Sequence, residues 1–287
     1  MSGYLIGILH PGEMGASIGG ELVKRGHVVL WASNGRSTAT VQRAEAMKMT
    51  DFKGIDAVVE RVNVVLSICP PHAALDLAAE VTGFKGTFVD MNAISPEHAR
   101  DISTIIEAGG GRYVDGGIIG LPVGKGGWTH LYLSGPNANN VAMLFRETRI
   151  ETYVISDRIG DASALKMAYA AWTKGSDALL LAVRAFARHQ GVEDSLIAEW
   201  RSCRSDLLLQ SLNSAQKVVT KGWRWVGEMT EIASSFADAG LPEGFHSAAG
   251  NIFARSPRET NAKLNDGTLD RVLTALEAPS SKLGEIK

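Results

Sequence analysis

The sequence predicts an α/β protein: a doubly wound parallel sheet of the Rossmann type, followed by an all-α C-terminal domain. In the first half, short strands rich in valine and isoleucine alternate with helical periods. A glycine-rich turn follows the first strand. The 287 residues include 31 glycines, about 11% against an average near 7%, and 21 of them precede residue 151. We therefore expect a sheet domain over residues 1–158 and a helical domain over residues 159–287.

The elements of the first half follow from hydrophobic periodicity. An apolar run at residues 4–9 is typical of a first strand, and residues 14–25 have helical spacing. Ser95 and Pro96 suit the N-cap and first turn of a helix at 96–108. The same reasoning predicts strands at 28–32, 62–69, 87–91, 113–115, 131–134 and 152–155, and helices at 38–49 and 73–81.

The second half is helical throughout. Residues 162–190 contain one interior glycine and no proline, so we expect a single long helix there. Gly240 and Pro242 form a typical helix-ending pair. The other predicted helices lie at 193–211, 215–239, 246–254 and 269–276.

Charge and composition argue against several classes. With 29 Lys and Arg against 31 Asp and Glu and no long basic run, nucleic acid and anionic membranes are poor partners. No stretch of about 20 apolar residues predicts a membrane span, and the N-terminus lacks the features of a signal peptide. Two cysteines fit a reducing cytoplasm. The seven histidines show no metal-binding spacing, so no metal is expected.

The turn after the first strand predicts a dinucleotide site. Gly12 and Gly15 fit the second and third glycines of G-x-G-x-x-G, while His10 holds the first position. Gly12 lets the backbone approach a pyrophosphate, and Gly15 lets the helix pack closely on the strand. The helix N-terminus at Glu13 and Met14 presents N–H groups to the anion. The alternative is an ordinary glycine-rich turn.

The end of the second strand favours NADP over NAD. An NAD-binding domain carries Asp or Glu about 20 residues after the turn, but here no acid lies between the second strand and Glu45. Arg36 would instead bind a 2′-phosphate, which a carboxylate would repel. The cofactor-contacting residues expected in this loop are Ser33, Asn34, Arg36 and Ser37. In the alternative, Arg36 is a solvated loop cation.

The chain resembles the β-hydroxyacid dehydrogenase superfamily, which includes 3-hydroxyisobutyrate dehydrogenase, 6-phosphogluconate dehydrogenase and, more distantly, imine reductases. The likeness is carried, in family order, by residues 12–15, 26–29, 64–70, 90–96 and 115–120. Residues 164–175 and 223–229 are similar to a poorly characterised helical domain that follows such NAD(P)-binding domains. The resemblance implies cofactor contacts from Cys69 and Pro70.

The resemblance also implies a general acid/base. The family places a lysine early in the long interdomain helix, and Lys166, six residues after Gly160, matches it. Tyr169 occupies the position where the family usually has asparagine, and Thr173 continues the same helix face. The alternative for Lys166 is a surface lysine on an amphipathic helix.

Further substrate contacts are implied at the strand ends. Asn92 matches a position usually held by serine, and Ser95 follows it. Ile119 and Gly120 stand where the family often has a serine before a glycine pair, which indicates a less polar substrate. In the helical half the expected pocket residues are Trp225, Glu228 and Met229.

These expectations combine into an NADPH-dependent oxidoreductase that acts on a carbonyl or a secondary alcohol. Lys166 handles the proton, and Asn92 and Tyr169 complete the catalytic group. The family resemblance implies a homodimer through the helical domains. Two alternatives stay open: an imine reductase with Tyr169 or Asp177 as the acid, and an NADP(H) sensor without turnover.

Overall fold

The computed structural model describes residues 3–259 and 266–278. The chain divides into two compact units, Met1–Met167 and Ala168–Lys287. The division falls inside a helix, α7 (Asp161–His189), whereas the sequence predicts it after residue 158. The first turns of α7 belong with the sheet because they pack closely on it. A Cβ atom added to Gly117 of the sheet would lie 2.7 Å from the Ala162 carbonyl oxygen.

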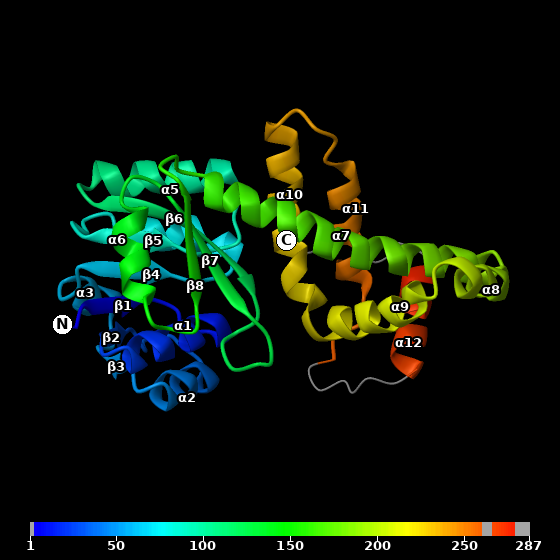
Figure 1. Cartoon of the computed structure of the whole chain (residues 1–287), viewed down its shortest axis with the longest axis horizontal. Helices are drawn as coiled ribbons and strands as arrows, with labels where there is room; N and C mark the ends of the chain where they lie inside the picture. Colours follow the sequence, from blue (N-terminus) through cyan, green and yellow to red (C-terminus); the bar gives the residue numbers. More distant parts are fainter. Residues whose placement is uncertain (1–2, 260–265, 279–287) are drawn as a thin grey trace. The chain divides into compact units, whose positions relative to one another are not determined.

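The first unit is built on an eight-stranded sheet of order β3-β2-β1-β4-β5-β6-β7-β8 (Figure 1). The strands are β1 (Leu5–Ile8), β2 (Val28–Trp31), β3 (Thr50–Asp51), β4 (Val64–Ser67), β5 (Thr87–Asp90), β6 (Arg112–Gly120), β7 (Thr129–Ser134) and β8 (Glu151–Ser156). Strands β1 to β6 are parallel, but β7 runs antiparallel to β6. The expected Rossmann-type sheet is confirmed, and it is mostly parallel. The connection at 121–128 is too short for a crossover and forms a hairpin.

Helices cover both faces of this sheet (Figure 1). They are α1 (Glu13–Lys24), α2 (Thr38–Ala46), α3 (Ile55–Val59), α4 (Ala74–Glu80), α5 (Pro96–Ala108) and α6 (Ala138–Ala142), with 3₁₀ turns η1 (Pro71–Ala73) and η2 (Met143–Phe145). One core packs Ile8 and Trp31 against Ile18 of α1. The other core, on the opposite face, packs Phe88 against Ile102 of α5. Two buried faces explain the near-continuous apolar strands.

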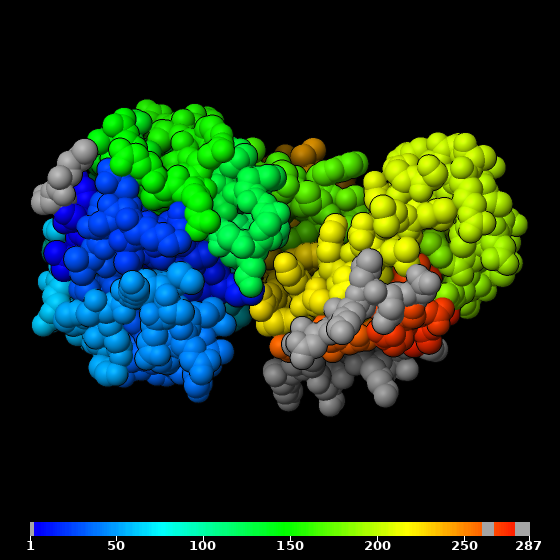
Figure 2. All heavy atoms as spheres, turned by 60° about the horizontal axis from the view of Figure 1, so that its bottom comes forward, coloured from blue at the N-terminus to red at the C-terminus, as the bar shows by residue number. Residues whose placement is uncertain are grey.

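The second unit is all-α, as predicted. It holds the rest of α7, then α8 (Glu193–Cys203), α9 (Asp206–Lys217), a π-helical turn η3 (Val218–Gly222), α10 (Trp223–Asp238), α11 (Gly244–Arg255) and α12 (Asp266–Glu277). Helix α9 packs against α8 and α12. In Figure 2 the yellow surface of α9 adjoins the red surface of α12. The single helix expected over 162–190 is confirmed.

Two helix predictions in this unit are wrong. Residues 193–211 form parts of two helices, because the chain leaves helical geometry at Arg204. The region 215–239 is interrupted by the π-helical turn. The stop at Gly240 is confirmed: its φ is +70°, and the Leu241 N–H donates to the Phe236 carbonyl at 2.8 Å. Across residues 3–259 and 266–278, no helix combines the length and apolarity needed to cross a bilayer.

Candidate functional site

The glycine-rich turn joins β1 to α1 at the carboxyl edge of the sheet. A Cβ atom at Gly15 would lie 2.5 Å from the His10 carbonyl oxygen, so only glycine lets α1 begin this close to β1. A Cβ atom at Gly12 would meet nothing within 4 Å. The protein itself therefore does not require glycine at residue 12. Open space above a helix N-terminus instead fits the close approach of a pyrophosphate.

His10 occupies the first fingerprint position without a left-handed backbone. Burial, together with the nearby charge of Arg36, lowers the pKa of His10 to about 4. The imidazole is therefore neutral at physiological pH. Its Nδ1 atom is buried and has no hydrogen-bond partner among the described residues. A neutral ring can accept or donate a hydrogen bond at this turn without adding charge.

The loop after β2 places Arg36 next to the glycine-rich turn, as its effect on His10 indicates. The Arg36 Nε atom is buried and has no hydrogen-bond partner within the described chain. Ser37 caps α2, since its Oγ accepts from the Thr40 N–H at 3.3 Å. The Asn34 N–H donates to the Lys53 carbonyl at 2.9 Å. An orphaned guanidinium N–H beside this turn suits a phosphate.

Two residues that lie beside this loop were not predicted from the sequence. Arg43 of α2 donates to Thr40 Oγ1 at 3.1 Å, and its buried Nε has no partner among the described residues. Asp51 of β3 accepts from Ser33 Oγ at 2.8 Å. Against the effect of burial, hydrogen bonds from Lys53 and Ser33 lower the pKa of Asp51. Asp51 was not predicted because the search for an acid covered the end of the second strand, and Asp51 comes from the neighbouring strand β3.

Asn92 is buried and forms hydrogen bonds that connect the ends of β4 and β5. It is 3% exposed. Its Oδ1 accepts from the Cys69 N–H at 2.6 Å, and its Nδ2 donates to Ser67 Oγ at 3.0 Å. Both ends of the amide are thus used to hold the end of β4 beside the end of β5. Burial and the nearby Asp90 raise the pKa of the Cys69 thiol to about 12, so it is neutral.

Ser95 and Ile119 are also interior residues. Ser95 is fully buried, and its Oγ accepts from the His98 N–H at 3.2 Å at the start of α5. The N-cap prediction is therefore confirmed. Ile119 is 4% exposed. Gly120 has a φ of +119° at the start of the hairpin. The side chains of Ser95 and Ile119 are thus used in capping and packing, whereas substrate contacts from the backbone of Ile119 and Gly120 stay a prediction.

Lys166 lies on the second turn of α7, against strand β6. It is partly buried, and its Nζ donates to the Ile118 carbonyl oxygen at 2.7 Å. Because β1, β2, β4, β5 and β6 are parallel, their carboxyl ends share one edge. The first unit thus brings Lys166, the glycine-rich turn and Arg36 to the same edge of the sheet. Ligands bind at such an edge in open α/β sheets.

In the second unit, Tyr169 is 41% exposed and Thr173 Oγ1 donates to its carbonyl at 3.1 Å. Glu228 forms an ion pair with Lys174. Trp225 packs edge-to-face on Phe253, with ring centroids 5.2 Å apart.

Met229 and Asp177 have structural surroundings. Met229 is fully buried beside Gly250, so its expected role in a pocket wall is corrected to core packing. Asp177 is 9% exposed and accepts from Ser214 at 2.6 Å and from Lys217. Its carboxylate is therefore engaged inside the helical unit.

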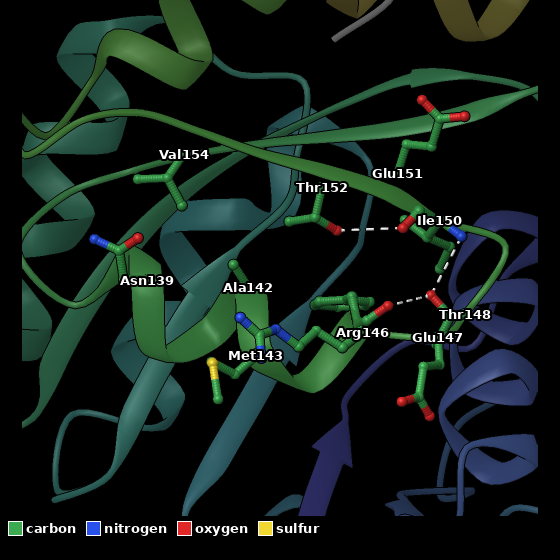
Figure 3. A pocket seen from close by; sticks show the side chains of 11 residues that line it. Asn139, Ala142, Met143, Arg146, Glu147, Thr148, Ile150, Glu151, Thr152 and Val154 are labelled. Atoms are coloured by element: carbon green, nitrogen blue, oxygen red, sulfur yellow. Dashed lines mark hydrogen bonds between the residues drawn. The ribbon is translucent and has the colours of Figure 1, made fainter.

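A pocket of about 570 Å³ lies elsewhere, between α6, η2 and β8 (Figure 3). Thr148 lies in the lining of this pocket, where its Oγ1 accepts from the Ile150 N–H and donates to the Phe145 carbonyl. None of the predicted site residues lines this pocket, so it is separate from the edge that carries Lys166. Among the described residues, no cluster of His, Cys, Asp and Glu could hold a metal ion.

Two families match the chain. Residues 5–138 match the NAD binding domain of 6-phosphogluconate dehydrogenase, and residues 187–256 match a domain of unknown function (DUF1932). A 28.5 kDa protein of Methanothermus fervidus, described as uncharacterized, is 31% identical over 193 residues, which are 67% of this chain and 74% of that protein. The chain belongs to this NAD-binding family.

Solved structures agree with the fold. The conserved protein MTH1747, described as structurally similar to 3-hydroxyacid dehydrogenases, is 28% identical with a TM-score of 0.66, covering 87% of this chain and 96% of that one. Mycobacterium tuberculosis 3-hydroxyisobutyrate dehydrogenase with L-serine is 18% identical with a TM-score of 0.69, covering 96% and 100%. An Aspergillus terreus reductive aminase in complex with NADPH and ethyl-5-oxohexanoate is 18% identical with a TM-score of 0.56, covering 88% and 93%. The fold is therefore that of NAD(P)-dependent hydroxyacid dehydrogenases and reductive aminases.

Proposed function

We propose that the protein is an NADPH-dependent oxidoreductase that reduces a carbonyl, or oxidises the corresponding secondary alcohol, with Lys166 as the general acid/base. One observation carries the proposal. The Lys166 ammonium is fixed 2.7 Å from the Ile118 carbonyl, at the sheet edge that also holds the glycine-rich turn. A proton donor and a dinucleotide turn at one edge suit hydride transfer coupled to proton transfer.

The residues at the turn fit a nicotinamide dinucleotide. Gly12 opens onto free space above the N-terminus of α1, which suits the pyrophosphate. The Nε atoms of Arg36 and Arg43 are buried without a hydrogen-bond partner in the described part of the chain, which favours the 2′-phosphate of NADP. Asp51, which accepts from Ser33 in this loop, forms an ion pair with Lys53 Nζ at 2.6 Å, and this pairing offsets its charge. We therefore assign the cofactor as NADP(H) rather than NAD(H).

When bound, the nicotinamide supplies or accepts the hydride. Lys166 donates a proton to the substrate oxygen in the reducing direction and withdraws it in the oxidising direction. The carbonyl of Ile118 orients the ammonium by accepting a hydrogen bond from Lys166 Nζ at 2.7 Å. Asn92 acts at a distance, by holding the ends of β4 and β5 together.

Reduction of a C=N bond is the second candidate. The solved reductive aminase has the same fold, and its complex contains NADPH. Of the two acids considered for an imine, Asp177 is buried and paired, whereas Tyr169 is 41% exposed. Tyr169 is therefore the more accessible of the two for this reaction.

Steady-state NADPH oxidation separates these functions. Wild type, Lys166→Ala and Tyr169→Phe are assayed on matched ketones and preformed imines, with Lys85→Ala as a control, since Lys85 bonds the Gly109 carbonyl at the opposite sheet edge. We expect Lys166→Ala to lose ketone reduction by about 100-fold or more, with Lys85→Ala unchanged. Loss on imines alone in Tyr169→Phe would favour the imine reaction. Tight NADPH binding without oxidation by any substrate would favour the sensor.

We further propose a homodimer formed through helix α7. Five large apolar side chains on this helix are solvent-exposed in the single chain: Leu165, Tyr169, Trp172, Leu179 and Phe186. They recur at intervals of three, four or seven residues, so they form one stripe along the helix. Trp172 is 76% exposed. A stripe of this kind is typical of a helix that packs on a second copy.

A further inference from the structure

Helix α7 begins without a capping side chain of its own. The residue before Asp161 is Gly160, which has a φ of +99° and no side chain that could accept a hydrogen bond. The first N–H groups of a helix have no acceptor within the helix, and burying them without one is costly. Their acceptors must therefore come from elsewhere in the first unit.

Strands β6 and β7 supply these acceptors. Asp115 Oδ2 accepts from the Gly160 and Ser163 N–H groups at 3.1 and 3.0 Å, and Asp115 Oδ1 accepts from Ser163 Oγ at 2.6 Å. Ser134 Oγ accepts from the Ala162 N–H at 3.0 Å and donates to Asp115 at 3.0 Å. Asp115 is 1% exposed, and Ser134 and Ser163 are fully buried. A buried carboxylate from the sheet thus replaces the local N-cap.

Strand β6, which carries Asp115, also accepts a hydrogen bond from Lys166 of α7. Lys166 follows Ser163 by three residues, so the two side chains lie on one face of α7. Ile118, whose carbonyl accepts from Lys166 Nζ, follows Asp115 by three residues on β6. Between them Gly117 allows backbone contact with α7. The helix is therefore fixed to β6 at one end by Asp115 and one turn later by Lys166.

We propose that Asp115 is a positioning residue for Lys166: it caps α7 from the sheet and so fixes where the Lys166 ammonium lies. The inference depends on the proposed function of Lys166, because only then does its position affect catalysis. Asp115 does not touch the substrate in this account. Its effect passes through Ser163 and the first turn of α7.

The test compares Asp115→Asn with Asp161→Asn. Asparagine keeps the size of Asp115 but removes its charge and turns one acceptor into a donor. Asp161 is a matched control at the same helix end, since its carboxylate bonds Ser156 and Arg158 instead. Two measurements need no substrate: amide hydrogen exchange over residues 160–166, and the acetylation rate of Lys166 by mass spectrometry, with the exposed Lys24 as internal reference.

In Asp115→Asn we expect exchange over residues 160–166 to rise about 10- to 100-fold, the scale of a lost hydrogen bond to a charged acceptor. Lys166 acetylation should rise several-fold, and kcat should fall at least tenfold while the NADPH Kd stays within twofold. Asp161→Asn should behave as wild type. If Asp115→Asn does not fold, Ser163→Ala removes the 2.6 Å bond, keeps the carboxylate, and should shift the same readouts in the same direction.

Unchanged exchange and acetylation in both Asp115→Asn and Ser163→Ala would overturn the inference. Failure of the proposed function gives a different result. In that case wild type fails to oxidise NADPH with any of the substrates tested, while hydrogen exchange and Lys166 acetylation still respond to Asp115→Asn. An active wild type whose kcat survives Asp115→Asn, with loosened exchange, would show that the cap does not position Lys166 for catalysis.

Discussion

Replacing Arg36 by alanine is expected to weaken NADPH binding and leave NADH binding nearly unchanged. Arg36 lies beside the glycine-rich turn, and its Nε is buried without a partner among the described residues. Hydrogen bonds to charged groups contribute about 1.5–3 kcal/mol. Loss of the guanidinium–phosphate pair should therefore raise the NADPH Kd by about 10- to 150-fold. NADH has no 2′-phosphate, so its Kd should change by less than about threefold.

Isothermal titration of both nucleotides at fixed ionic strength measures this difference, because screening weakens exposed ion pairs. Arg61→Ala is the matched control: Arg61 stacks on Phe52 at 5.0 Å after α3, where no cofactor contact is expected. Arg43→Ala should give a smaller selective loss, because Arg43 also bonds Thr40. Equal losses for NADPH and NADH in Arg36→Ala would refute the 2′-phosphate assignment. Unchanged affinity for both would make Arg36 a solvated cation.

Three further predictions concern the turn, a buried acid and the helix stripe. Gly12→Ala should keep the melting temperature and lose affinity for both nucleotides at least tenfold, whereas Gly15→Ala should lower the melting temperature as well, because its Cβ would clash with the backbone. Burial raises the pKa of Asp90 to about 7, so the folded chain holds a proton that the unfolded chain releases near pH 4. Stability should fall as the pH rises from about 4 to 7, and Asp90→Asn should reduce that slope and gain on the order of 1–3 kcal/mol at pH 8 in urea titrations. Trp172→Glu should give monomers in light scattering, while Leu209→Glu, at a residue 60% exposed on α9, should not.

Each of these has a result that would contradict it. Normal nucleotide affinity in Gly12→Ala would show that the pyrophosphate does not bind at the turn. If stability depends on pH as steeply in Asp90→Asn as in wild type, the dependence comes from other groups. Dimers that survive Trp172→Glu but not Leu209→Glu would move the interface away from the α7 stripe.

The fold was largely predictable because its signals are local. Apolar runs and helical periods located β1, α5 and the single helix α7. The elements that were not predicted are very short or depend on contacts between distant parts of the chain. Strand β3 has two residues and α3 has five, too few for periodicity. The antiparallel β7 depends on a hairpin, which the spacing of apolar runs does not distinguish from a crossover.

The site divides in the same way. The glycine-rich turn and Arg36 were found because their chemistry lies in one short segment. Asn92 was expected to face the substrate, but it is buried by contacts with Ser67 and Cys69, which lie 25 and 23 residues away. Asp51 was missed for a similar reason, since it reaches the loop from another strand. Pairing between strands decides which polar residues are free for ligands, and spacing along the chain does not record it.

The central claim is hydride transfer from NADPH to a carbonyl carbon, and transfer of an isotope label tests it most directly. Wild type is incubated with NADPH deuterated at nicotinamide C4, in each stereochemical form, and a ketone from the panel. Lys166→Ala serves as the control. We predict that one form yields an alcohol one mass unit heavier, with deuterium on the carbinol carbon and a yield that depends on Lys166. An alcohol product without deuterium from either form would contradict the account.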